Sequence, residues 1–226
     1  MLERYAGSSN LRAFVLGVAN TIPVFGGIAT GVDIFLTSEA AAFERIKFDI
    51  LLDELSRGDR QLTSADMSSE PVIRACIVTI EATLRTSREQ KIRWFARLLL
   101  AGSGPQPQLS MADEHEDYFK ILDDLSYREI GILAMLASFE GHYPELSRLE
   151  RASTFWVDFT KDVCTRFTIP DGELPGLLTR LSRTGVYDPI VGAYLGYEGG
   201  KGELSPLYRR LVSLTGINID QFEQAS

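Results

Sequence analysis

The 226-residue chain has few cysteines, few histidines and a shortage of basic residues. It contains two cysteines, two histidines, and 23 lysine and arginine residues against 31 aspartate and glutamate residues. The cysteines do not resemble a disulfide framework or a zinc site. Because Cys76 and Cys164 both lie in apolar helical patterns, we expect them to be buried free thiols. The net charge of -8 argues against generic nucleic-acid binding, since neutralising phosphates requires a basic surface.

The motifs of common catalytic sites are also missing. The sequence has no Gly-x-Ser-x-Gly elbow, no Walker phosphate loop and no metalloprotease helix. The run Asp113-Glu-His115-Glu-Asp117 contains residue types that bind metals, but adjacent residues on a helix point in different directions. We interpret its acids as favourable charges at a helix N-terminus, and we expect His142, in a turn, to be solvated. We therefore expect no enzymatic activity, no metal and no cofactor.

One long segment has no charge at all. Residues 13–32, between Arg12 and Asp33, read AFVLGVANTIPVFGGIATGV, which is at the threshold length for a membrane span. Pro23 and the Gly26-Gly27 pair interrupt it, so we favour a helical hairpin over 1–37 that is buried in protein. A membrane span or a membrane-inserting hairpin is the alternative. The candidate membrane or oligomer contacts are Gly17, Pro23, Phe25, Gly26, Gly27 and Gly31.

Because no convincing secretory signal is present, we expect a cytoplasmic protein, with peripheral or inducible membrane association as an alternative.

The segment 38–102 is predicted to be a helical module. Its first helix extends from Ser38 to Gly58, and further helices begin at Ser69-Glu70-Pro71 and at the capping-box sequence Thr86-Ser-Arg-Glu89. The apolar stripe of the first helix consists of Phe43, Ile46, Ile50, Leu51 and Leu55. The residues expected on the solvated face of the last helix are Arg88, Lys91, Arg93 and Arg97. Residues 102–112, rich in glycine, proline and glutamine, form the candidate domain boundary.

The segment 113–218 is predicted to be a winged-helix-like module. A capping box at Ser126-Tyr-Arg-Glu129 opens one helix, and helical patterns over 152–167 and 173–183 follow. A strand over 191–197, a glycine turn over 198–202 and a return strand at Glu203-Leu204 make a two-stranded ribbon. Ser205 then caps a helix that ends at Gly216. The predicted fold class is mainly α: a helical N-terminal module followed by this winged-helix-like module.

A winged helix raises the question of DNA binding. Residues 176–212 contain five basic and three acidic side chains, which is a weak basic bias. The candidate nucleic-acid contacts are Arg180, Arg183, Lys201, Arg209 and Arg210. Because the predicted recognition helix has no cluster of amides or arginines to read base edges, and because a fold does not imply a function, nucleic acid is the less favoured partner.

Several spaced blocks of the chain carry a family resemblance. They are the glycine-rich apolar N-terminus, Lys91-Ile-Arg-Trp94-Phe-Ala-Arg-Leu98-Leu-Leu-Ala101, Tyr118-Phe-Lys-Ile-Leu-Asp-Asp-Leu125-Ser126-Tyr-Arg-Glu-Ile130, Leu177-Leu-Thr-Arg-Leu-Ser-Arg-Thr-Gly185-Val and Gly202-Glu-Leu-Ser-Pro-Leu-Tyr-Arg-Arg210-Leu. In this order they resemble the Abi-alpha family of bacterial proteins, whose name associates it with abortive infection by phage. Tyr208 stands where the last block usually has glycine.

The resemblance implies a role in phage defence or a toxin-like response, with no catalytic or ligand residues to carry over. We therefore expect a non-enzymatic defence protein that acts through its apolar N-terminal segment and protein–protein contacts. Its expected partner is a second copy of itself or another defence protein, and a membrane surface is a further candidate. The alternative function is that of a winged-helix transcription regulator that binds DNA.

Overall fold

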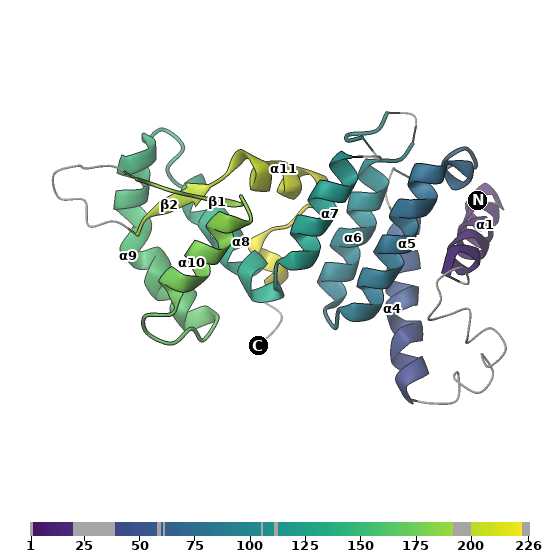
Figure 1. Cartoon of the computed structure of the whole chain (residues 1–226), viewed down its shortest axis with the longest axis horizontal. Coiled ribbons are helices and arrows are strands. Elements are labelled where there is room, and N and C mark those ends of the chain that lie inside the picture. Colours follow the sequence, from purple (N-terminus) through teal and green to yellow (C-terminus); the bar gives the residue numbers. More distant parts are fainter. Residues whose placement is uncertain are drawn as a thin grey trace. The chain divides into compact units, whose positions relative to one another are not determined.

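The computed structural model describes residues 2–19, 39–57, 60, 62–104, 106–110, 113–191 and 200–222. The described part is mainly helical and includes a two-stranded antiparallel sheet (Figure 1). This confirms the mainly α fold class. The chain divides into two compact units, Met1–Asp123 and Asp124–Ser226. The candidate boundary at 102–112 therefore lies inside the first unit.

The first unit is built from helices. Its elements are α1 (Leu2–Ala19), α4 (Glu39–Ser56), the 3-10 turn η1 (Asp66–Ser68), α5 (Glu70–Arg85), α6 (Glu89–Ala101) and α7 (Glu114–Asp124). Helices α4, α5 and α6 contact one another, and α1 contacts both α4 and α5. Their shared core contains Val15, Leu51, Ile80 and Leu99, all fully buried. Helix α7 is linked to α6 by the stacked rings of Phe119 and Phe95, whose centroids are 5.0 Å apart.

The helix starts of this unit follow the local sequence only in part. Helix α5 begins as expected, with Ser69 at the N-cap position and Pro71 in the first turn. The capping box expected at Thr86 is wrong, because the backbone stays extended through Arg88 and α6 starts only at Glu89. The hydroxyl of Thr86 instead accepts a hydrogen bond from the backbone N–H of Arg88, at 3.2 Å.

The described residues of the second unit form four helices and the small sheet. Its elements are α8 (Tyr127–Gly141), α9 (Arg148–Arg166), α10 (Leu174–Arg183), β1 (Tyr187–Pro189), β2 (Gly202–Leu204), α11 (Pro206–Thr215) and the 3-10 turn η2 (Ile219–Phe222). The capping box of α8 is confirmed: the N–H of Ser126 donates to the Glu129 carboxylate, and the N–H of Glu129 donates to the Ser126 hydroxyl. Ser205 caps α11, and Gly216 ends it in the left-handed conformation that favours glycine.

The ribbon starts earlier than the sequence pattern predicts. Tyr187 pairs with Leu204, and Pro189 pairs with Gly202. The first strand expected over 191–197 is therefore misplaced at its start, and residues 192–199 lie outside the described residues. The return strand at Glu203-Leu204 is confirmed. A Cβ at Gly202 would come within 2.2 Å of the Tyr187 ring, so the ring packs over a position that only glycine can occupy without a shift.

Candidate functional site

The first half of α4 exposes large apolar side chains. Phe43 is 65% exposed and Ile46 is 52% exposed. They are three residues apart and therefore lie on one face of the helix. Ile50, one turn later, is partly buried and packs against the core of the first unit. We call Phe43 and Ile46 the α4 apolar face. Of the five apolar residues that define the predicted stripe, Leu51 and Leu55 are fully buried in the core, Ile50 is partly buried, and Phe43 and Ile46 are exposed.

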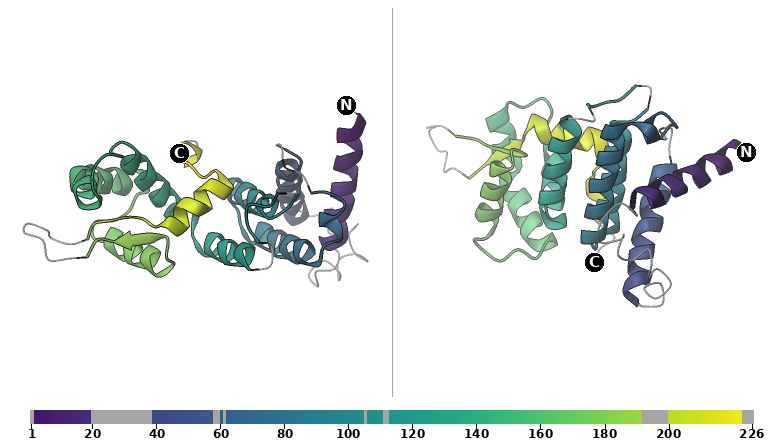
Figure 2. Two further views of the ribbon diagram at one scale, coloured as in Figure 1. Left: turned by 90° about the horizontal axis from the view of Figure 1, so that it is seen from above. Right: turned by 45° about the vertical axis from the view of Figure 1, so that its right-hand side comes forward.

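The exposure has a geometric cause in the lengths of the neighbouring helices. The ammonium group of Lys47 donates to the carbonyl of Leu84, 2.5 Å away, one residue before α5 ends. The eight residues of α4 that precede Lys47 span about 12 Å. Figures 1 and 2 both show this end of α4 extending past the ends of α5 and α6. Neither helix is therefore long enough to cover Phe43.

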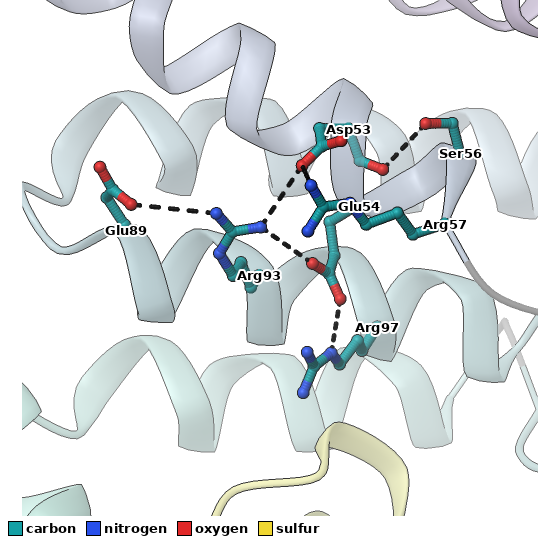
Figure 3. Close-up of polar contacts among 7 residues, drawn as sticks. All are labelled: Asp53, Glu54, Ser56, Arg57, Glu89, Arg93 and Arg97. Carbon is teal, nitrogen blue, oxygen red and sulfur yellow. Dashed lines mark hydrogen bonds and ion pairs between the residues drawn. The ribbon is translucent and has the colours of Figure 1, made fainter. Parts of the chain in front are cut away.

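One turn beyond Ile50, on the same side of the helix, α4 carries a charged network with α6 (Figure 3). Glu54 is 8% exposed, and its two carboxylate oxygens lie 2.6 Å from Arg97 Nε and 3.2 Å from Arg93 Nη1. The guanidinium of Arg93 also reaches Asp53 at 3.6 Å. Because Arg93 and Arg97 are one helical turn apart, a single carboxylate contacts both. The network therefore holds the second half of α4 against α6.

This network corrects the expected solvated face of α6. Arg93 and Arg97 point to Glu54, and Lys91 is 8% exposed and donates to the backbone carbonyl of Asp123 at 2.7 Å. The residues were assigned to solvent because their partners are distant in sequence. Both oxygens of Glu54 accept from arginine, so this carboxylate is neutralised in place and serves as a structural anchor.

The N-terminal apolar run begins inside the first unit. Val15, Val18 and Ala19 of α1 are buried in its core, as expected for a helix packed in protein. Leu16 is 46% exposed, and Gly17 is exposed with open space where a Cβ would lie. Among the described residues, no helix combines the length and apolar character needed to cross a bilayer. The remaining candidate contacts, Pro23, Phe25, Gly26, Gly27 and Gly31, lie outside the described residues.

The candidate nucleic-acid contacts of the second unit are largely engaged within the unit. Arg180 Nε lies 3.2 Å from the buried Glu129 carboxylate, and Arg209 forms an ion pair with the buried Glu140. Lys201 donates to the hydroxyl of Ser153 at 3.3 Å. Arg183 and Arg210 are exposed. Two of the five cations are thus neutralised by carboxylates, which lowers the positive potential available to a phosphate backbone.

Two carboxylates that sequence reasoning missed fix the ribbon to the helices. Glu140 of α8 is 4% exposed and accepts from the backbone N–H of Leu204 at 2.8 Å, besides pairing with Arg209. Glu203 of β2 lies 2.8 Å from Arg148 Nε and 2.9 Å from Arg151 Nη2 of α9. No local spacing signals these contacts, because their partners are separated by about fifty residues or more of chain.

Two titratable groups outside these networks, His115 and Cys76, are buried. His115 is 2% exposed, and burial lowers its pKa to about 4. Burial raises the pKa of Cys76 to about 12, which keeps it a protonated thiol. Cys164 is only half-buried, so the expected burial is wrong for this thiol. His142 is exposed, as expected. In the part of the chain that the structure describes, no three histidine, cysteine or acidic residues are grouped to hold a metal ion.

No family model, no curated protein and no solved structure matches this chain. The resemblance to the Abi-alpha family stays a prediction.

Proposed function

We propose that this chain is a non-enzymatic bacterial phage-defence protein that acts in the cytoplasm by binding another protein through the α4 apolar face. The observation that carries the binding role is the exposure of Phe43 and Ile46 on a helix end that α5 and α6 do not reach. Contiguous exposed apolar surface marks interaction sites, whereas isolated apolar residues do not. The resemblance of the sequence blocks to the Abi-alpha family supports the defence setting.

The charge of α4 favours a protein partner over a lipid surface. The helix sequence EAAAFERIKFDILLDELS contains five acidic and two basic residues. Helices that lie in a membrane interface are usually rich in lysine and arginine on their polar face, because the cytoplasmic leaflet is anionic. An acidic helix in a chain of net charge -8 is repelled by such a surface.

A plaque assay with a matched pair of variants tests this function. We expect bacteria that express the full chain to show fewer plaques, across a panel of phages, than bacteria with an empty vector. Phe43→Glu should abolish the protection because it places a charge on the binding face. Val157→Glu, at a position 76% exposed on α9, should leave it intact. Circular dichroism and protein level confirm that both variants fold.

Two results would contradict the proposal. An unchanged plaque number for every phage in the panel would remove the defence role. Full protection by a folded Phe43→Glu variant would remove the α4 apolar face from the function.

DNA binding by the second unit is the second candidate. Three helices, α8, α9 and α10, followed by the ribbon of β1 and β2, have the element order of a winged helix, which favours it. A gel shift of the full chain at low and moderate salt tests it. Salt-sensitive binding that weakens in Arg183→Glu would support DNA binding, and no shift at low salt would exclude it.

A further inference from the structure

We infer that α1 is a releasable cover of the first unit: it detaches from α4 and α5 and loses its helix as one unit, while α4, α5 and α6 stay folded. The inference goes beyond the proposed function, because it concerns α1 and does not use the α4 apolar face. It rests on the weak helix-forming sequence of α1, on the kind of contacts that hold it, and on the polar contacts that join the other helices.

The sequence of α1 is poor for a helix. Gly7, Ser8, Ser9 and Asn10 follow one another inside it, and Gly17 lies in its last turn. Glycine, serine and asparagine form helices less readily than alanine or leucine does. Gly17 is exposed, and a Cβ there would meet no atom within 4 Å, so no packing contact requires glycine at this position. Helix α1 therefore depends on its packing against the rest of the unit.

The contacts that hold α1 are mainly apolar. Its buried side chains recur at steps of three, four and one residues along one stripe, and they are Leu11, Val15, Val18 and Ala19. The ion pair between α1 and α4 joins Arg12 Nη2 to Asp49 Oδ1 at 3.9 Å, and both side chains are more than half exposed. An exposed pair at this distance contributes little to stability. Apolar burial, which is not directional, therefore accounts for most of the attachment.

The other helices of the bundle are joined by polar contacts that do not involve α1. Glu54 of α4 binds Arg93 and Arg97 of α6, and Lys47 of α4 donates to the carbonyl of Leu84 in α5. Figures 1 and 2 show α1 at the edge of the first unit, beside α4 and α5. Detachment of α1 breaks none of these polar contacts. We therefore expect α1 to open locally, at a lower free energy than the unfolding of the whole unit.

Detachment changes which apolar side chains are accessible. In the closed state Val15 and Val18 are buried, and both belong to the uncharged run that starts at Ala13. In the open state a partner reaches them. A partner that binds them only in the open state shifts the equilibrium toward that state. The opening of α1 therefore controls access to the first part of the run.

Thiol labelling of the full chain measures the opening. In a Cys76→Ala/Cys164→Ser background, one new thiol is placed at a fully buried position, by Val15→Cys in α1 or by Ala96→Cys in α6. Dithionitrobenzoate reacts with a buried thiol only when that position opens. We expect Val15→Cys to react roughly 100-fold faster than Ala96→Cys, because local opening is more frequent than unfolding of the bundle, and still more slowly than free cysteine.

A second substitution tests that the helix opens as one unit. Gly17→Ala, added to Val15→Cys, should slow the labelling about 5-fold, because alanine stabilises the helical state that is lost on opening. The matched control is Gly141→Ala, at the end of α8, where a Cβ also has open space. This control should leave the labelling rate unchanged.

Three results would overturn the inference. Equal labelling rates for Val15→Cys and Ala96→Cys would show that α1 opens only when the whole unit unfolds. Labelling of Val15→Cys as fast as free cysteine would show that α1 does not cover the unit. An unchanged labelling rate after Gly17→Ala would show that α1 does not lose its helix when Val15 becomes accessible.

Discussion

Acidification should destabilise the first unit through His115. This side chain stacks on Phe119, with ring centroids 5.6 Å apart, and its Nε2 has no hydrogen-bond partner among the described residues. Burial disfavours the charged imidazolium and lowers the pKa to about 4, with the neighbouring Glu116 acting in the opposite direction. In the unfolded chain the pKa returns to about 6.5. Between these values the unfolded state binds more protons, so stability falls as the pH falls.

The expected size of the effect follows from the two pKa values. Linkage gives a loss of about 2 kcal/mol in the free energy of unfolding between about pH 7.5 and pH 5. The full loss, reached below the folded-state pKa, is about 3 kcal/mol. Carboxylates also titrate in this range, but their contribution is common to the wild-type protein and to a histidine variant. The difference between the two proteins therefore isolates His115.

Urea unfolding followed by tryptophan fluorescence measures this difference. The chain has two tryptophans, and Trp156→Phe leaves the fully buried Trp94 of α6 as the reporter of the first unit. In this background we expect His115→Phe to lose about 2 kcal/mol less than its parent over the same pH interval. His142→Phe, at the exposed histidine, should match the parent. An identical pH dependence in the parent and His115→Phe would refute the argument from burial.

Two further predictions concern the contacts that hold each unit together. Glu54→Gln should lower the free energy of unfolding by about 1–3 kcal/mol, because two arginines lose their carboxylate. The control Glu70→Gln, in an exposed ion pair, should lower it by less than about 0.5 kcal/mol. Equal effects of the two variants in urea unfolding would contradict the anchoring role of Glu54. Gly202→Ala should cost about 1–3 kcal/mol through collision with the Tyr187 ring. Gly141→Ala, where a Cβ has open space, should not destabilise the chain, and equal melting temperatures for the two alanine variants would show that the ring moves freely.

Contacts between residues close in sequence were predictable. The capping box joins Ser126 to Glu129, three residues apart, and helical spacing alone brings these groups together. The same holds for Ser205 and the helix it caps, and for the glycine that ends that helix. Thr86 shows the limit of this reasoning, because its capping-box spacing is present but the backbone before α6 is extended.

Contacts between residues far apart in sequence were not predictable. The arginines of α6 looked solvated because the carboxylate that binds them, Glu54, is about forty residues away. The first strand was placed over 191–197 on local β-propensity, whereas the observed strand starts at Tyr187, whose ring packs over Gly202 of the other strand. In both cases the decisive neighbour belongs to a different element.

The candidate site also depends on contacts between residues far apart in sequence, so its exposed residues were not predictable from the sequence. The uncharged run pointed to the N-terminal region as the part of the chain that binds, and its described part, residues 13–19 of α1, is buried along one face. The exposed Phe43 and Ile46 were indistinguishable in sequence from Leu51 and Leu55, because all four share helical spacing.

The sequence by itself determined the helices, most of their ends and the scarcity of chemical motifs, since these depend on residues within a turn or two of each other. The tertiary structure alone decided which apolar residues of α4 are covered. Burial depends on where the neighbouring helices stop, and the contact of Lys47 with the end of α5 places Phe43 beyond their reach.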